Sequence, residues 1–416
     1  MKILISLFAI LPVLFACPLY AQGFMMYGTT RMDAARAGTG TGWTDPLSAA
    51  YRNPAFLVTG NTKISLGGML VIDSNKVNGT NHKDYSGIEE IAFASPLPIF
   101  GLKNRLFIGF ALQTPGTKVY SINAMPVTQP QFMFLRPSVK RLNLAVSIAV
   151  RILDNLSIGA GFTVLPQVNG TVTVDFTTSG QASATQVDVK LRFAPVVGIA
   201  YQPTKFLSLG IAYRGGNKTP LSIPVTVRVS DQIPDIFARI DAQELYAPHV
   251  ISAGAAFHFG RFRVAADLNY LLYSSLVQPS PDVYLMDSSG KVTKASVTPS
   301  PGPRNVFSPS ASFTYSPADY ISLTTGYSFM PSVLKEQTGQ TNLLDCPKHT
   351  VSIGAGLDLY KLVHIPMGMD FSTTFTFYTG QTDEKSSFIP ENPGYPSISY
   401  KAYSINAGLS LWVRFK

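Results

Sequence analysis

The chain has 416 residues and a formal net charge of +9, with 33 Lys and Arg against 24 Asp and Glu. Only 14% of the residues are charged, against roughly 25% in soluble domains, and 46% are hydrophobic, which disfavours an ordinary soluble enzyme. Beyond residue 21, no uncharged apolar run approaches the roughly 18 residues of a spanning helix, which excludes a polytopic helical membrane protein. No linker-like segment divides the chain, so we expect one large β-rich unit.

The N-terminus has the layout of a secretory signal. A basic start, an apolar stretch and a run of small and turn-forming residues follow one another over residues 1–22. This order is typical of a signal peptide, and cleavage after Ala21 would remove residues 1–21. Two alternatives are an uncleaved anchor helix, which Pro12 disfavours, and a lipobox that ends at Cys17.

Residues 22–60 show helix signals instead of strand signals. The run 30–37 predicts a short helix that ends at Gly38. Asp45-Pro46 supplies an N-cap and a first-turn proline for a second helix, 47–52, which stops before Asn53-Pro54-Ala55. Helices this short cannot span a membrane, but they can fill the lumen of a barrel.

The rest of the chain alternates between apolar and other residues. Arg141–Val150, Arg261–Leu272 and the C-terminal run after Tyr403 each show a period of two, typical of a strand with one apolar face. A soluble sandwich alternates in the same way, but here short turns and long polar or Pro-rich connections also alternate, as in outer-membrane barrels.

We therefore predict an all-β fold, a transmembrane antiparallel β-barrel of about 14 strands over residues 61–416, with both ends on the periplasmic side. The predicted strands cover residues 62–74, 88–98, 104–114, 138–152, 156–178, 185–201, 206–230, 246–259, 261–274, 304–315, 320–330, 349–359, 363–380 and 397–415. Closure is expected because a barrel leaves no unpaired backbone edge in lipid.

The N-terminal segment carries a family resemblance. The runs Ala34-Ala35-Arg36-Ala37-Gly38-Thr39-Gly40 and Ala49-Ala50-Tyr51-Arg52-Asn53-Pro54-Ala55, followed by a strand, resemble the N-terminal hatch of the FadL/TodX family. That family consists of outer-membrane transporters for long-chain fatty acids and other hydrophobic compounds. The resemblance implies a barrel of about 14 strands, a mainly helical hatch over residues 22–60 that plugs the lumen and contains Asn53, Pro54 and Ala55, and lateral release of ligand beside a kinked strand.

Three regions are candidates for ligand contact. In the family the mature N-terminus lines the ligand pocket, which implies this role for Phe24, Met25 and Met26, although a segment packed on the wall is the alternative. Arg31, Arg36 and Arg52 are expected to pair with Asp33, Asp45 and lumen carboxylates, or one of them meets a ligand carboxylate.

The connection Pro115–Pro137 is unusually apolar for an external loop. Its residues Phe132 and Phe134 form part of a capture groove, or the loop folds inward against the barrel mouth. Arg136 beside them would hold a ligand carboxylate or face lipopolysaccharide phosphates.

The third predicted strand ends at Pro115-Gly116. Proline lacks the N–H that a ladder needs, so this pair would interrupt pairing and admit a kink. In the family a kinked strand at this position makes the lateral opening, so Pro115 and Gly116 are candidates for it. A simple strand end is the alternative.

The sequence carries no motif of a metal, disulfide, catalytic or nucleic-acid-binding site. The five histidines fall in unrelated segments, and signal cleavage would leave Cys346 alone, so neither a metal site nor a disulfide is expected. No hydrolase, phosphate-binding or dinucleotide motif occurs, so we expect no catalytic residue, no cofactor and no enzyme activity. Dense Lys and Arg runs are missing, which speaks against nucleic acid.

The expected function is passive transport of hydrophobic molecules, such as long-chain fatty acids or hydrocarbons, across the bacterial outer membrane. Ligand capture at external loops and lateral release are expected, with hydrophobic small molecules and outer-membrane lipids as partners of a monomer. One alternative is a general diffusion porin, which the low charge disfavours. The other is a barrel enzyme or adhesin that uses its long loops.

Overall fold

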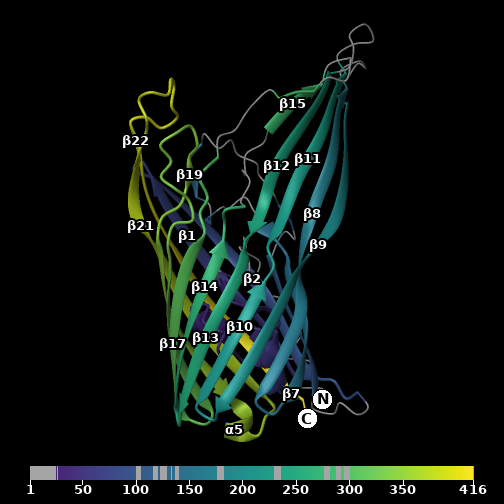
Figure 1. Cartoon of the computed structure of the whole chain (residues 1–416), viewed down its shortest axis with the longest axis vertical. Helices are drawn as coiled ribbons and strands as arrows, with labels where there is room; N and C mark the ends of the chain where they lie inside the picture. Colours follow the sequence, from purple (N-terminus) through teal and green to yellow (C-terminus); the bar gives the residue numbers. More distant parts are fainter. Residues whose placement is uncertain are drawn as a thin grey trace.

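A computed structural model of the chain describes residues 25, 27–99, 105–115, 120–121, 129–132, 134–135, 140–175, 182–228, 236–275, 282–286, 292–294 and 300–415. Its main feature is a closed antiparallel β-barrel (Figure 1). Fourteen strands form the ring, in the order β1 (Lys63–Val77), β2 (Thr80–Pro96), β3 (Leu106–Pro115), β7 (Asn143–Leu153), β8 (Leu156–Asp175), β9 (Ala182–Thr204), β10 (Leu207–Arg214), β13 (His249–Phe259), β14 (Phe262–Leu272), β17 (Val306–Ala318), β18 (Ile321–Met330), β20 (Lys348–Asp358), β21 (Met367–Glu384) and β22 (Ser397–Arg414).

Neighbouring strands of the ring pair antiparallel, and the last strand closes on the first. β22 runs alongside β1 from Arg414 opposite Lys63 to Tyr400 opposite Val77. Each predicted strand overlaps one strand of this ring, so the predicted barrel is confirmed. The predicted strand 206–230 was too long, because it also covers β11 (Asn217–Arg228), which lies outside the ring. The predicted signal peptide, residues 1–21, lies outside the described residues.

The wall is apolar outside and polar inside. On β7, Asn143, Ala145 and Ser147 are buried, whereas Ile148 on the other face is 48% exposed. Soluble proteins bury their apolar face, but a barrel in lipid presents it outward and keeps small and polar side chains in the lumen. The alternation in the sequence therefore separates a lipid face from a lumen face.

The connections differ in length at the two ends. Two-residue turns such as 154–155 and 260–261 lie at the end that also carries α5 (Leu359–Val363), and long connections lie at the other end (Figure 1). α5 replaces a predicted short turn, so β21 begins at Met367 instead of residue 363. The helix ends at His364, whose φ of 59° caps it in the left-handed region.

The first hairpin is longer than predicted. The first predicted strand ends at residue 74 and the second begins at residue 88, but β1 and β2 continue to a two-residue turn at Asn78-Gly79. Both turn residues have positive φ, 45° and 87°, which Asn and Gly tolerate and which matches the twist of the hairpin.

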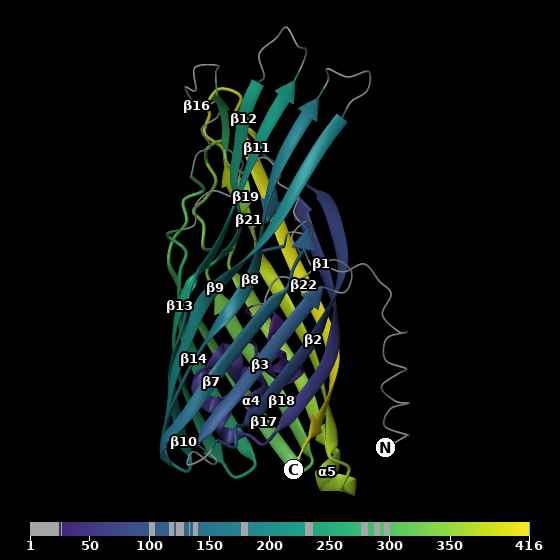
Figure 2. The same cartoon turned by 90° about the vertical axis from the view of Figure 1, so that its right-hand side faces the viewer.

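Further strands lie in the long connections. β11 (Asn217–Arg228) and β12 (Ile236–Ala247) form an extension above the ring with β15 (Asp282–Met286) and β16 (Val292–Lys294), seen side-on in Figure 2. The remaining short strands pair as β4 (Tyr120–Ser121) with β6 (Lys140–Arg141), and as β5 (Gln131–Phe132) with β19 (Leu343–Leu344).

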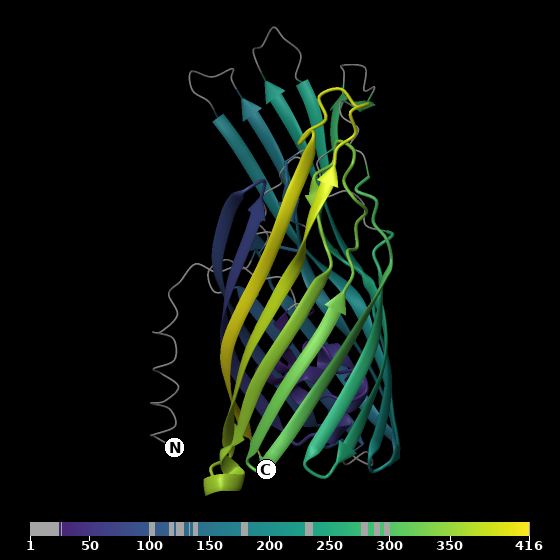
Figure 3. The same cartoon turned by 90° about the vertical axis from the view of Figure 1, so that its left-hand side faces the viewer.

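Residues 27–60, which we call the N-terminal segment, lie inside the lower half of the barrel (Figure 3). They form α3 (Arg31–Ala35), α4 (Pro46–Arg52) and the 3-10 helix η2 (Pro54–Thr59). Thr30, Asp45 and Asn53 cap the three helices by accepting from backbone N–H groups of the first turn. In the part of the chain that the structure describes, no helix is long and apolar enough to cross a membrane.

Candidate functional site

The Asn53-Pro54-Ala55 run fastens the N-terminal segment to the wall. The side-chain Nδ2 of Asn53 donates to the carbonyl of Thr41 at 2.9 Å and to the carbonyl of Ile199 on β9 at 3.1 Å. Its Oδ1 accepts from the Ala55 N–H at 3.2 Å. One amide side chain thus joins two turns of the segment to a strand.

Glycines in the wall make room for this contact. A Cβ on Gly198 would lie 2.0 Å from Asn53 Oδ1, and a Cβ on Gly210 would lie 1.9 Å from the Thr41 carbonyl oxygen. A Cβ on Gly159 would meet the Pro54 backbone at 2.5 Å. The segment therefore needs glycine at these inward positions.

Polar side chains of the wall satisfy the backbone of the N-terminal segment. Four serine hydroxyls donate to its carbonyls: Ser147 to Ala50 (2.8 Å), Ser157 to Ala55 (2.9 Å), Ser208 to Gly42 (2.8 Å) and Ser352 to Ala35 (2.7 Å). Asp267 on β14 accepts from the N–H groups of Gly40 (2.7 Å), Thr41 (2.6 Å) and Gly42 (3.3 Å). The segment is hydrogen-bonded to the barrel on several sides.

The three arginines singled out in the sequence all have carboxylate partners. Arg31 pairs with Glu90 of β2, Arg36 pairs with Asp45, and Arg52 Nε lies 2.9 Å from Asp33 Oδ1. Burial would raise the pKa of Asp45, but the Arg36 charge and the hydrogen bonds to that carboxylate lower it below its ordinary value. The structural interpretation of these arginines is therefore confirmed.

Arg214 at the end of β10 differs from them. Its guanidinium donates to the Arg52 carbonyl at 3.0 Å and to Ser252 Oγ at 3.0 Å, and it lies 5.3 Å from the centre of the Tyr51 ring. The residue is 6% exposed, and among the described residues no carboxylate forms an ion pair with it. A buried positive charge without a direct ion pair is costly, so this position suits an anion.

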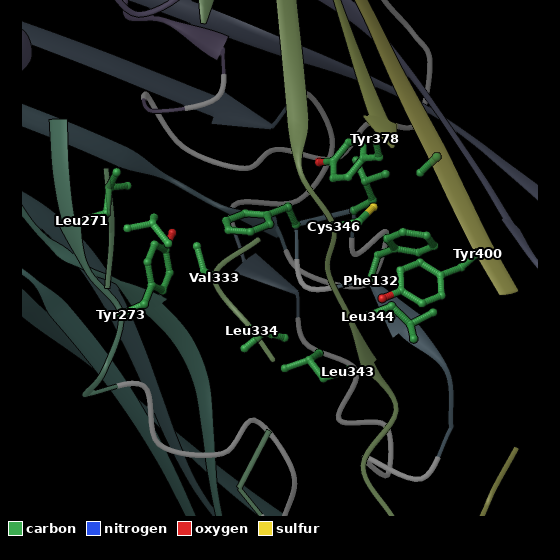
Figure 4. Close-up of a cluster of buried hydrophobic side chains, with 14 of the residues drawn as sticks. Phe132, Leu271, Tyr273, Val333, Leu334, Leu343, Leu344, Cys346, Tyr378 and Tyr400 are labelled. Carbon is green, nitrogen blue, oxygen red and sulfur yellow. The ribbon is translucent and has the colours of Figure 1, made fainter. Parts of the chain in front are cut away.

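External connections fold into the upper lumen and form an apolar cluster, which we call the loop cluster (Figure 4). Phe132 meets the Tyr378 and Tyr400 rings edge-on at 6.1 and 5.7 Å, and Phe134 meets Tyr273 at 6.1 Å. Leu135 belongs to the same connection as Phe132 and Phe134. The other members come from the strands and from the connection that contains β19: Val250, Leu271, Val306, Val333, Leu334, Leu343, Leu344, Cys346, Ile398 and Ala402.

The loop cluster shows how Phe132 and Phe134 of the connection Pro115–Pro137 lie. Phe132 is 3% exposed and Phe134 is 8% exposed, so the connection folds inward at these positions instead of presenting them to solvent. β5 pairs with β19 there, which joins two external connections inside the barrel mouth.

A cavity of about 110 Å³ lies between the loop cluster and the N-terminal segment. Met25, Phe134 and Leu271 provide apolar walls, and Arg52, Arg214 and Lys348 also line it. Lys348 Nζ is 2.7 Å from Asp345 Oδ1 and 4.0 Å from the centre of the Phe134 ring. Arg52 and Lys348 have direct carboxylate partners, whereas Arg214 has no ion pair among the described residues.

The predicted site residues fall into three groups. Met25 lines the cavity and packs on the loop cluster. Phe24, Met26, Gly116 and Arg136 lie outside the described residues. Pro115 is the last residue of β3, opposite Ile88 of β2, whereas the ladder of β3 with β7 ends at Gln113; neither ladder has a register shift.

The sequence patterns did not single out Arg214 or Lys348. A signal for Arg214 existed, because strict alternation places it on the same face as Ser208 and Ala212, and a charged residue on the lumen face of a barrel strand is a functional candidate. Among the described residues, no group of three or more His, Cys, Asp or Glu side chains could hold a metal ion.

Several solved structures share this fold. A Pseudomonas aeruginosa FadL homologue matches with a TM-score of 0.64 at 14% identity, covering 93% of this chain and 98% of that chain. The toluene transporter TodX of P. putida gives 0.62 at 14% identity, with 94% and 99% covered. The toluene transporter TbuX of Ralstonia pickettii gives 0.57 at 14% identity, with 95% and 100% covered. A search of curated protein sequences gives no match.

The sequence itself identifies the family. Residues 13–395 match the family described as "Outer membrane protein transport protein (OMPP1/FadL/TodX)". Because this is a family of transport proteins, the assignment sets aside the barrel enzyme. The chain belongs to the OMPP1/FadL/TodX family and is an outer-membrane transport β-barrel.

Proposed function

We propose that this barrel is a passive channel for hydrophobic molecules that carry a carboxylate, such as long-chain fatty acids. The observation that carries the proposal is the cavity in the upper lumen, where apolar side chains surround the buried Arg214 guanidinium. A ligand carboxylate would supply the missing counterion through two parallel hydrogen bonds, while its chain contacts Met25 and Phe134.

The charge distinguishes this ligand class from a neutral hydrocarbon. Two of the solved structures with this fold are described as toluene transporters, and toluene has no charged group. A neutral aromatic would leave Arg214 without a counterion, whereas a fatty acid would neutralise it. Monoaromatic hydrocarbons are therefore the second candidate, favoured only by the likeness to those transporters.

Ligand entry requires the loop cluster to move. A cavity of 110 Å³ is smaller than the about 300–1,000 Å³ of typical ligand pockets, so an acyl chain must displace cluster side chains. Phe132 and Phe134 would then be the first apolar contacts of an entering ligand. Phe24, Met26 and Arg136 keep their proposed roles beside them.

The N-terminal segment serves as the hatch in this proposal. Its contacts with inward-facing serines, Asp267 and the wall glycines support a plug that small polar solutes do not pass. Deleting residues 25–56 should leave a barrel that inserts but conducts ions and small sugars. A deletion variant with wild-type conductance would contradict the hatch.

Release is proposed to be lateral, into the membrane beside the end of β3. Pro115 has no N–H for the ladder, and Gly116 next to it would loosen the strand. The position fits an exit because the described pairing of β3 with β2 ends there, at Pro115 opposite Ile88.

Uptake by proteoliposomes tests the ligand class. The wild type should take up a labelled long-chain fatty acid, and Arg214→Gln should slow this uptake at least tenfold while leaving toluene uptake unchanged. Arg261→Gln is the matched control, because Arg261 lies in a turn at the opposite end of the barrel. Equal fatty-acid uptake by both variants would remove Arg214, and with it the carboxylate, from the proposal.

A further inference from the structure

The outer face of the barrel carries three lysines at one level on three adjacent strands. Lys76 of β1 lies directly opposite Lys401 of β22, and Lys83 of β2 is opposite Ser74, diagonal to Lys76. All three are exposed. Like charges directly opposite each other on neighbouring strands are destabilising, so the arrangement calls for an anion between them.

The lysines mark the external end of the lipid-facing band. Outward residues of β22 are apolar from Val413 to Tyr403, and Lys401 is the next outward residue. These ten residue steps, at about 3.4 Å each and tilted about 40°, cover about 26 Å, which equals the apolar band of an outer-membrane barrel. Leu70 of β1 and Leu409 of β22 on the same faces are 49% and 50% exposed. The lysines thus reach the level of the outer-leaflet head groups.

A hollow lies between two of these lysines. Lys76 and Lys401 line a cavity of about 400 Å³ together with Gln381, Thr382 and Ser399. It forms where the register of β21 against β22 shifts between Tyr378 and Gln381, and Gly380 at that shift leaves room. Two ammonium groups, hydroxyls and an amide line it, so it can receive a phosphate.

The floor of the hollow is fixed by hydrogen bonds at the tip of the first hairpin. The Asn78 N–H donates to the Ser399 carbonyl at 2.8 Å, and the Ser399 N–H donates to Asn78 Oδ1 at 2.9 Å. This reciprocal pair holds the hairpin that carries Lys76 against the strand that carries Lys401. Among the described residues, no carboxylate forms an ion pair with Lys76, Lys83 or Lys401.

We propose that Lys76, Lys401 and the hollow between them bind the phosphate of an outer-leaflet glycolipid of the lipid A type, with Lys83 as a second contact. The acyl chains of the same molecule would lie along the apolar outer face of β1 and β22. Free phosphate shares the head-group chemistry but lacks this apolar contact. The site lies on the outer face of the barrel and is separate from the cavity in the lumen.

Binding of diphosphoryl lipid A to the delipidated protein in detergent tests the site, with affinity read by native mass spectrometry. Since each lysine near an anionic surface contributes about 1 kcal/mol, Lys76→Gln with Lys401→Gln should weaken binding about 30-fold, and Lys76→Gln alone about fivefold. Replacement of both by Arg should retain binding. Lys205→Gln with Lys361→Gln, at the opposite end of the barrel, removes the same charge and should have no effect.

Two further binding measurements distinguish the phosphate of a lipid from free phosphate. Dephosphorylated lipid A should bind the wild type as weakly as lipid A binds the double Gln variant. Inorganic phosphate at 10 mM should not displace lipid A, because it makes no contact with the apolar face. Equal affinity of the double Gln variant and its control, equal binding of dephosphorylated lipid, or displacement by inorganic phosphate would each overturn the proposal.

Discussion

Asp267 is the residue on which the position of the N-terminal segment depends most directly. Its carboxylate accepts three backbone N–H groups, of Gly40, Thr41 and Gly42, at 2.6 to 3.3 Å, and the residue is 5% exposed. A net hydrogen bond to a charged group contributes about 1.5–3 kcal/mol. Asp267→Asn keeps the shape and one acceptor oxygen, but removes the charge and one acceptor.

The expected loss is about 2–4 kcal/mol, which raises the population of the detached turn about 30- to 1,000-fold. Amide hydrogen exchange at residues 40–42 should accelerate by this factor, because those N–H groups lose their acceptor. The barrel strands do not depend on this contact, so the temperature at which the folded band disappears on gels should change by only a few degrees.

The matched control is Asp319→Asn, since Asp319 lies in a turn between β17 and β18 at the end of the barrel that carries α5. Exchange at residues 40–42 in this control should equal that of the wild type. Exchange in Asp267→Asn within threefold of the wild type would refute the assignment of Asp267 as the anchor of the segment.

Three more predictions concern packing, reactivity and release. Gly198→Ala should lower the free energy of unfolding by about 1–3 kcal/mol and expose the N-terminal segment to protease, because the new Cβ overlaps Asn53. Gly68→Ala is the control, because its Cβ meets only a carbonyl oxygen at 3.5 Å and should not increase digestion. Equal digestion of the two variants would contradict this packing. Cys346 should resist maleimide at pH 8, because burial raises the pKa of its thiol to about 12 and leaves almost no thiolate; labelling at the rate of the unfolded chain would disprove its burial. Replacement of Pro115-Gly116 by Val-Thr should abolish fatty-acid uptake with normal insertion, and unchanged uptake would remove this exit.

The strand ring follows from local patterns, because alternation and turn chemistry are properties of neighbouring residues. The patterns failed where one signal was overlooked, since Asn78-Gly79 is a strong hairpin turn and allowed β1 and β2 to extend through a polar stretch. They also failed at β12, whose residues were expected to be a connection, and at the predicted strand 206–230, which is divided into β10 in the ring and β11 beyond it.

The candidate site depends on contacts between distant residues, which a pattern cannot assign. The sequence indicated Asp33 and Asp45 as partners for the three arginines of the N-terminal segment. Which arginine meets which carboxylate, and that Glu90 of β2 is the third partner, follow only from the placement of β2 and the two helices. Arg214 stands out for the opposite reason, because the fold buries it beside Arg52 and Ser252 without an ion pair. The inward fold of Phe132 likewise results from its contact with Tyr378 and Tyr400.

The central claim is that the lumen passes hydrophobic molecules while it stays closed to polar ones. Wild-type protein in one preparation of liposomes, loaded with a labelled small sugar and exposed to a labelled long-chain fatty acid, tests both halves together. The account predicts fatty-acid uptake that is at least tenfold above that of protein-free liposomes, with sugar retained. Release of the sugar as fast as through an open porin, or fatty-acid uptake equal to that of protein-free liposomes, would contradict it.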